Sequence, residues 1–201
     1  GARARVLKGL EPNGDYLWSY REALVPEELP KSIVIVGSGA IGVEFASFYN
    51  SFGSEVTIIE LQDRILPVED IEISKIAEKE FGKQGIKILK GHSVKSHKKK
   101  AGRVEVVITN HKDDTTITLK TDKILSAVGV VGNVENLGLD VSRVKVEKNQ
   151  IIVDEFCRTD EDGIYAIGDV AGSPWLAHKA SHEAVICVDH IKNPAETHKL
   201  K

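Results

Sequence analysis

The chain of 201 residues lacks methionine and has only two cysteines, Cys157 and Cys187, which lie far apart in the sequence. This excludes a CxxC metal-binding pattern and a closely spaced redox pair. Two free thiols are typical of proteins from a reducing compartment. We therefore expect a cytoplasmic protein, or a protein of the mitochondrial matrix if the source is eukaryotic.

Long apolar runs and a strong charge of one sign are also absent. No run approaches the roughly 20 apolar residues that span a bilayer, and no secretory segment opens the chain. The formal net charge of -3 gives no electrostatic reason to expect nucleic acid or an anionic membrane as a partner. With 41% hydrophobic and 28% charged residues, the composition is that of a soluble globular protein.

A strand–helix–strand pattern lies between residues 33 and 60. Four β-branched residues at 33–36 predict a strand buried on both faces, as in a parallel sheet, and residues 56–60 predict the next strand. Between them, apolar residues at helical spacing predict one face of a helix that Gly53 ends: Ile41, Phe45, Phe48 and Phe52. The pattern therefore indicates a βαβ unit.

Further helices and strands are predicted on both sides of this unit. Ser19 and Glu22 form the pattern of a capping box, which predicts a short helix. A second helix is expected from Asp70, with an apolar face of Ile73, Ile76, Ala77 and Phe81, followed by a strand at residues 86–89. Residues 104–109 and 116–119 predict an antiparallel hairpin, and the preceding residues 98–100, all lysine, are expected in a solvated loop. Nearer the end, we expect strands at residues 124–129, 151–153 and 164–167 and a helix over residues 176–191.

A glycine-rich segment stands between the first strand and the helix of the βαβ unit: Gly37-Ser38-Gly39-Ala40-Ile41-Gly42. It fits the pattern GxGxxG, in which the first glycine allows a tight turn and the second lets a pyrophosphate lie against the backbone. The third glycine lets the helix pack close to the sheet. The phosphates would meet N–H groups at the positive end of the helix dipole. A tight turn without a ligand is the alternative interpretation.

Glu60 ends the second strand of the unit, about 20 residues beyond the glycines, where a carboxylate can accept hydrogen bonds from the ribose hydroxyls of adenosine. The 2′-phosphate of NADP would meet a like charge there, at a cost of several kcal/mol. Glu60 therefore predicts NAD rather than NADP. Arg64 leaves the alternative open, because a nearby arginine can accommodate that phosphate.

Other polar residues give weaker signals. Glu44 lies in the first turn of the predicted helix, where the dipole alone favours a negative charge, and contact with a nicotinamide is the second interpretation. Asp169 follows Gly168 after an apolar strand, where a carboxylate can bind ligand hydroxyls, although the segment by itself is no more than a strand and a turn. His178 and His182 share a helix face, but without a third ligand they do not predict a metal site.

Taken together, these motifs resemble the pyridine nucleotide–disulfide oxidoreductase family. The resemblance rests on residues 37–44, on Glu60, on Gly-Asp at residues 168–169 and on Leu-Ala-His-Lys-Ala at residues 176–180. The last segment is the usual sequence in the members that oxidise dihydrolipoamide. Residues 1–5 look like the stretch that precedes the family's NAD domain, so the resemblance covers nearly the whole chain.

The resemblance implies an α/β fold, namely a three-layer FAD/NAD-binding (Rossmann-like) domain with a parallel sheet and an antiparallel β-meander crossover. It implies that NAD is bound by Gly37, Ser38, Gly39, Ala40, Ile41, Gly42, Val43, Glu44, Glu60, Val94 and Gly129. It implies that FAD is bound by Asp169, Trp175, Leu176, Ala177 and His178. In such an enzyme, electrons pass from dihydrolipoamide to a cysteine pair, then to FAD, and then as hydride to NAD.

The chain also departs from this family. The family's Cys-x4-Cys pair belongs to an N-terminal FAD domain and its catalytic His-Glu pair to a C-terminal interface domain, and neither pair is present here. Residues 130–132 depart from the Arg and Pro that usually follow the glycine at position 129, which leaves the contacts of that loop open. We therefore expect no catalytic residue in this chain, only part of an FAD site, and no turnover by the chain alone.

These expectations describe a piece of a longer protein, with a processed natural chain as the alternative. We predict a linker from the FAD domain (1–12), the NAD-binding domain (13–130), a return segment of the FAD domain (131–191) and a polar tail (192–201). The complete enzyme would be a homodimer within a 2-oxo acid dehydrogenase complex. Two alternatives stay open: a segment of an NADPH-linked flavin disulfide reductase, and a stand-alone nucleotide-binding module.

Overall fold

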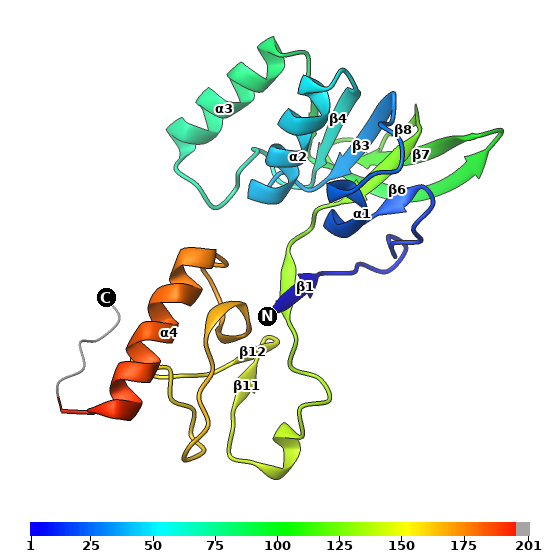
Figure 1. Cartoon of the computed structure of the whole chain (residues 1–201). Helices are drawn as coiled ribbons and strands as arrows, with labels where there is room; N and C mark the ends of the chain where they lie inside the picture. Colours follow the sequence, from blue (N-terminus) through cyan, green and yellow to red (C-terminus); the bar gives the residue numbers. More distant parts are fainter. Residues whose placement is uncertain (196–201) are drawn as a thin grey trace. The chain divides into compact units, whose positions relative to one another are not determined.

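The structure, a computed structural model, describes residues 1–195 and divides into two compact units (Figure 1). The larger unit comprises Ala4–Gly129, and the smaller unit comprises Gly1–Arg3 together with the chain from Val130 onward. The larger unit holds a parallel sheet and a three-stranded antiparallel sheet. In its described residues, the smaller unit contains only two-stranded sheets.

A five-stranded parallel sheet forms the centre of the larger unit, in the order β2–β9–β3–β4–β5. The strands are β2 (Leu17–Trp18), β9 (Lys123–Ser126), β3 (Ser32–Val36), β4 (Glu55–Glu60) and β5 (Lys87–Lys90). The helices of this unit are α1 (Tyr20–Leu24), α2 (Ala40–Ser51) and α3 (Ile71–Lys83). The predicted capping box is confirmed, because Ser19 caps α1 and exchanges hydrogen bonds with Glu22. The predicted strand–helix–strand order of β3, α2 and β4 is also confirmed.

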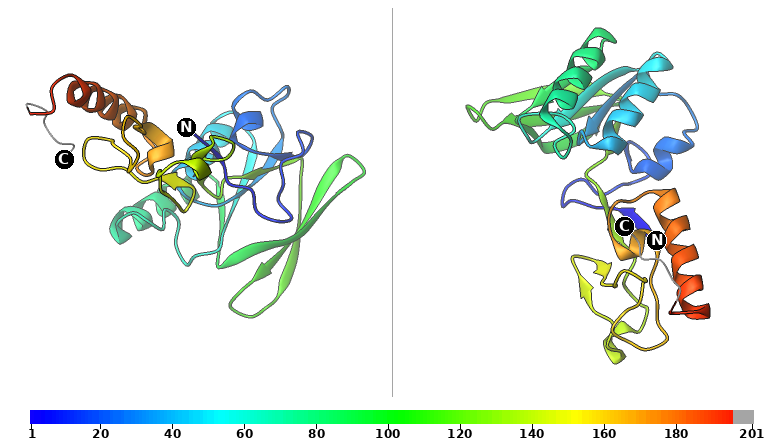
Figure 2. Two further views of the ribbon diagram at one scale, coloured as in Figure 1. Left: turned by 90° about the horizontal axis from the view of Figure 1, so that it is seen from below. Right: turned by 90° about the vertical axis from the view of Figure 1, so that its left-hand side faces the viewer.

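Two hydrophobic cores lie on opposite faces of this sheet. One core, between the sheet and α2, includes Ile33, Ile35, Val43, Ala46 and Tyr49. The other core, toward the antiparallel meander, includes Val34, Val36, Val104, Val106 and Ile108. The meander consists of β6 (His92–Lys100), β7 (Arg103–Asn110) and β8 (Thr116–Thr121). This layering of helices, sheet and meander confirms the predicted three-layer fold (Figure 2).

The apolar faces expected for the two helices are only partly confirmed, because Ile41, Phe45 and Phe81 pack against the core whereas other members of these faces are exposed. In α2, Phe48 is 43% exposed and Phe52, just beyond the helix, is 62% exposed. In α3, Ile73 and Ile76 are exposed, whereas Ser74 is buried. The buried residues of α2 are Gly42, Val43, Ala46 and Tyr49. The buried face of α2 thus combines small residues with the large side chain of Tyr49, so the size of the apolar side chains alone does not predict it.

Two segments outside the helices also differ from expectation. The lysines at residues 98–100 continue strand β6 instead of forming a loop, because they pair with residues 103–105 of β7. Lys99 also forms an ion pair of 2.6 Å with Asp15. Residues 164–167 do not form a strand, and Tyr165 makes only an isolated bridge to Arg158.

The smaller unit has short strands and one long helix, α4 (Ala177–Lys192). Strand β1 (Ala2–Ala4) pairs with β10 (Val130–Gly132), and β11 (Val146–Glu147) pairs with β12 (Gln150–Ile151). Two 3-10 helices are present, η1 (Leu139–Val141) and η2 (Gly168–Ala171), and a small core contains Val144, Ile151 and Ala166. Within residues 1–195, no helix is both long and apolar enough to cross a membrane.

A buried ion pair ties α4 to η2. Lys179 Nζ lies 2.8 Å from Glu183 Oε1, and the two side chains are 13% and 4% exposed. The second carboxylate oxygen of Glu183 accepts the Gly168 N–H at 2.7 Å. Lys179 Nζ donates to the carbonyl oxygen of Gly172 at 3.1 Å. The pair therefore holds both ends of η2 against the helix.

We predict that Gly42→Ala destabilises the larger unit, because a Cβ at this position would overlap the carbonyl oxygen of Gly37. Overpacking of this kind costs about 1–3 kcal/mol of unfolding free energy. Gly82→Ala is the matched control, since Gly82 also lies in a helix but a Cβ there meets nothing within 4 Å. The control should be neutral or stabilising by up to about 1 kcal/mol. Urea denaturation followed by circular dichroism measures both variants, and equal effects would contradict the close contact between α2 and the glycine turn.

We further predict that Lys179→Met loosens α4, because it leaves the Glu183 carboxylate buried without its cation. Removal of one partner from a buried pair costs about 3–5 kcal/mol. Lys83→Met, which breaks the exposed pair with Glu80 in α3, should cost less than about 1 kcal/mol. Hydrogen exchange of the α4 amides and of the Gly168 amide measures the first effect. Unchanged protection in Lys179→Met would show that the pair does not hold η2.

Candidate functional site

The glycine loop (residues 37–42) turns the chain from β3 into α2. Gly37 has a φ of 100°, and a Cβ there would lie 2.5 Å from the carbonyl oxygen of Ala127, so this position requires glycine. Gly39 is the N-cap of α2 and makes no side-chain cap, while a Cβ added to it would meet nothing within 4 Å. The first N–H groups of a helix have no partner inside the helix. The loop therefore offers backbone donors beside an open position at Gly39.

Glu60 lies against this loop with only 7% of its surface exposed. Its Oε2 accepts hydrogen bonds from the Ser38 N–H at 2.9 Å and from the Ser38 hydroxyl at 2.6 Å. Its Oε1 accepts the Gln62 N–H at 2.8 Å. The structure thus brings Glu60 to the glycine loop, as a ribose-binding carboxylate requires. Arg64, whose position left NADP open, donates from Nη2 to the carbonyl oxygen of Pro67 at 2.6 Å.

The other residues predicted for NAD lie in the same unit. Val94, in β6, packs against the core that contains Val36 and Ile59, the residues near the ends of β3 and β4. Gly129 is exposed, has a φ of 102° and follows the end of β9. Glu44 is exposed in the first turns of α2. The carboxyl ends of parallel strands meet at one sheet edge, so the glycine loop, Glu60 and Gly129 share that edge.

The residues predicted for FAD lie in the smaller unit. Asp169 is half-buried in η2, directly after Gly168, whose φ is 72°. Trp175, Leu176, Ala177 and His178 are exposed at the start of α4. Sequence reasoning gave no role to Lys179, although it lies in the motif at residues 176–180, and it missed Glu183; the two residues hold η2 in place. The only signal in the sequence that pairs them is a spacing of four residues, which is also common in exposed helical pairs.

The two cysteines are buried in the smaller unit and are not suited to redox chemistry. Burial raises the pKa of the Cys157 thiol to about 11, and it also raises the pKa of the Cys187 thiol. Since the thiolate is the reactive form, both groups stay protonated and unreactive near neutral pH. The described residues also contain no group of three or more side chains that could hold a metal ion.

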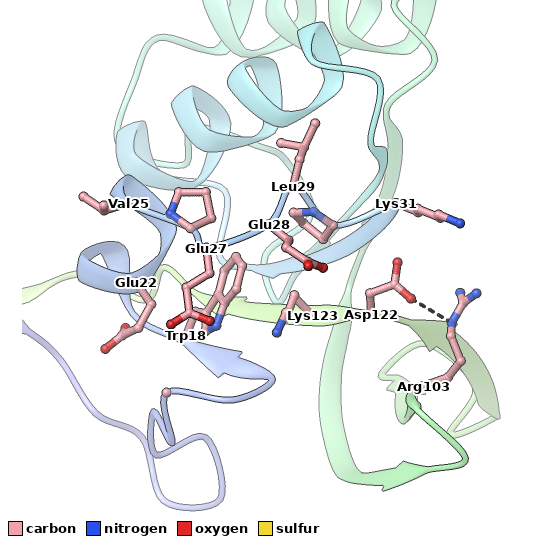
Figure 3. A pocket seen from close by; sticks show the side chains of 13 residues that line it. Trp18, Glu22, Val25, Glu27, Glu28, Leu29, Lys31, Arg103, Asp122 and Lys123 are labelled. Atoms are coloured by element: carbon pink, nitrogen blue, oxygen red, sulfur yellow. Dashed lines mark ion pairs between the residues drawn. The ribbon is translucent and has the colours of Figure 1, made fainter.

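A pocket of about 600 Å³ opens elsewhere on the larger unit (Figure 3). Its lining includes Lys31, which precedes β3, and Lys123, which begins β9, so it lies at the amino ends of the strands. Several of the charged side chains that line the pocket already form a hydrogen bond or an ion pair with another residue. Lys123 donates to the carbonyl oxygen of Asp15 at 2.5 Å, and Arg103 pairs with Asp122 at 3.1 Å. The pocket is therefore separate from the glycine loop and Glu60, which lie at the carboxyl ends.

Comparisons with known proteins show the family to which the chain belongs. The sequence profile of the pyridine nucleotide-disulphide oxidoreductase family matches residues 1–184. The chain is 48% identical over 198 residues to a dihydrolipoyl dehydrogenase of Rhizobium etli, covering 98% of this chain and 41% of the relative. It is 44% identical over 200 residues to a dihydrolipoyl dehydrogenase of Zymomonas mobilis, covering 100% of this chain and 43% of the relative.

Solved structures show the same fold. LpdA from Mycobacterium tuberculosis superposes with a TM-score of 0.88 at 29% identity, over 100% of this chain and 43% of that chain. RclA from Escherichia coli, an HOCl-induced flavoprotein disulfide reductase, gives a TM-score of 0.85 at 27% identity, over 99% of this chain and 45% of that one. The chain thus spans less than half the length of these relatives. Because the family profile covers most of its residues, the chain belongs to the pyridine nucleotide-disulphide oxidoreductase family.

Proposed function

We propose that the chain is the NAD-binding portion of a dihydrolipoamide dehydrogenase, together with part of its FAD site. The observation that carries the proposal is the buried carboxylate of Glu60, held against the glycine loop by Ser38. Identities of 44–48% with dihydrolipoyl dehydrogenases over nearly the whole chain support the choice within the family.

Each part of the site has a separate task in binding NAD. The backbone of the glycine loop approaches the pyrophosphate, and the N-terminus of α2 stabilises its negative charge. Glu60 accepts a hydrogen bond from a ribose hydroxyl of adenosine. Gly129 leaves room beside the nicotinamide ribose, Val94 flanks the adenine, and Glu44 contacts the nicotinamide from the first turns of α2. These residues bind and orient the nucleotide, and they move no proton.

Several features favour NAD over NADP. A 2′-phosphate would be placed next to a carboxylate that is 7% exposed, where like charges repel strongly. The arginine that could have compensated, Arg64, hydrogen-bonds to the backbone of its own segment at Pro67. An NADPH-linked reductase of the same family would place a positive charge at this position.

In the smaller unit, the residues fit part of a flavin site. Asp169 supplies a carboxylate for the ribitol hydroxyls, and Gly168, in the left-handed region, allows a close approach. The start of α4, from Trp175 to His178, would bring backbone N–H groups to the pyrimidine edge of the flavin. A helix N-terminus there stabilises the negative charge of a reduced flavin. When bound, FAD supplies the hydride that reduces NAD.

The chain alone lacks the groups for the first half of the reaction. Its two thiols are buried and protonated, and they are not spaced as a redox pair. We propose that the complete enzyme supplies the redox pair and the catalytic His-Glu pair from other segments. We also propose that it acts as a homodimer in a 2-oxo acid dehydrogenase complex, in the cytoplasm or the mitochondrial matrix.

The nucleotide preference is tested with NADH and NADPH, whose fluorescence changes on binding. The wild-type chain should bind NADH more tightly, and Glu60→Gln should weaken NADH binding by roughly tenfold or more, the size of a hydrogen bond to a charged group. Glu55→Gln is the matched control, because Glu55 is an exposed residue at the opposite end of the same strand. Tighter binding of NADPH by the wild type would contradict the role of Glu60 and favour an NADPH-linked reductase.

The absence of turnover is tested separately. The purified chain, supplied with FAD, NAD and dihydrolipoamide, should produce no NADH above the rate without protein, because it has no redox cysteine pair. Absorbance at the NADH maximum measures this rate, and NADH binding by the same sample shows that the chain is folded. Appreciable NADH production that depends on dihydrolipoamide would refute the proposed division of the reaction.

A further inference from the structure

Ser38 occupies the second position of the glycine loop, where the pattern GxGxxG demands no particular side chain. The residue is fully buried, and all its polar atoms are used. Its N–H and its hydroxyl both donate to Oε2 of Glu60, and its carbonyl oxygen accepts the Leu66 N–H at 2.9 Å. Ser38 therefore links the glycine loop to the end of β4 and to the segment that follows it.

The hydrogen bonds to Glu60 determine which part of its carboxylate a ligand can use. A carboxylate has about four acceptor positions, two on each oxygen. Ser38 fills both positions on Oε2, and the Gln62 N–H fills one position on Oε1. These three hydrogen bonds fix the orientation of the carboxylate, and so they also fix the direction of the remaining acceptor position on Oε1. The carboxylate cannot turn aside without breaking bonds to a buried charge, which are among the stronger hydrogen bonds in proteins.

Two of the three donors are backbone N–H groups, which any residue other than proline would supply. The hydroxyl of Ser38 is the only side-chain donor among them. The contact of 2.6 Å is also the shortest of the three. The side chain at position 38 therefore determines how firmly Glu60 is held. The hydrogen bonds from the two backbone N–H groups do not depend on which side chains those residues carry.

We propose that Ser38 is a positioning residue that determines the preference for NAD over NADP by locking the Glu60 carboxylate toward the ribose. This inference rests on the proposed function of the glycine loop. A loosely held glutamate can accommodate a 2′-phosphate by rotating toward solvent, whereas a locked one cannot. The same lock gives the ribose hydroxyl of NAD an acceptor that is oriented before binding, so less side-chain entropy is lost on binding.

The first test needs no nucleotide. Ser38→Ala should raise the hydrogen-exchange rate of the Gln62 amide by roughly tenfold, because the carboxylate that accepts this N–H loses its strongest tether. Ser54→Ala is the matched control, since Ser54 is also buried and its hydroxyl donates to the Pro30 carbonyl oxygen at 2.6 Å. Exchange of the Gln62 amide should be unchanged in the control. Equal exchange in the wild type and Ser38→Ala would overturn the lock.

The second test measures the ratio of NADH affinity to NADPH affinity. In Ser38→Ala this ratio should fall by roughly tenfold, the size of one hydrogen bond to a charged group, while Ser38→Thr, which keeps the hydroxyl, should restore it. Ser54→Ala should lose stability without a change in the ratio. A ratio in Ser38→Ala equal to that of the wild type, or a ratio in a folded Ser38→Thr equal to that of Ser38→Ala, would overturn the inference and leave the proposed function standing. Failure of the wild type to prefer NADH would overturn both.

Discussion

A buried carboxylate, which has no cationic partner among residues 1–195, is the feature on which the proposed nucleotide site depends. Glu60 accepts three hydrogen bonds, and none of the three donors carries a charge. Burial of a carboxylate is costly unless hydrogen bonds compensate, so the glycine loop and the segment after β4 must fold around it together. Among the residues that the structure describes, no cation forms an ion pair with this carboxylate, so under the proposed function it accepts hydroxyl donors and repels a phosphate. We therefore propose that the contacts that stabilise this sheet edge also select the ligand.

The smaller unit uses a buried glutamate in a different way. Glu183 also accepts an N–H from a glycine-containing turn, at Gly168, but Lys179 neutralises its charge. Because Lys179 and the Gly168 N–H each bind one oxygen of the Glu183 carboxylate, few acceptor positions remain for a ligand. The effect of Glu183 is on the backbone of η2, which also contains Asp169, a half-buried residue directly after Gly168. We propose that Glu60 binds a ligand, whereas Glu183 supports the backbone of η2.

The sequence predicted the local structure correctly at positions where the backbone has room only for glycine. The turn at Gly37 and the close contact at Gly42 leave no room for a Cβ, so the glycines could be recognised from spacing alone. The exposed positions of Phe52 and Ile76 could not be predicted this way, because which face of a helix is buried depends on its tertiary packing and not only on the spacing of apolar residues. The binding roles of Val94 and Gly129 came only from the family resemblance and stay predictions. The Lys179–Glu183 pair has the spacing of an ordinary surface pair, and only its burial, a tertiary property, makes it structural.

The division of the chain limits what either unit can do alone. Hydride transfer requires the reacting atoms to lie about 3–3.5 Å apart in the correct orientation. The groups that we assign to NAD lie in the larger unit, and those assigned to FAD lie in the smaller one. We therefore expect nucleotide selectivity to be a property of the larger unit, because Ser38, Glu60 and Gln62 all belong to it. We propose that the reaction rate depends in addition on segments of a longer protein, so we expect a loss of selectivity at Ser38 and a loss of turnover to be separable effects.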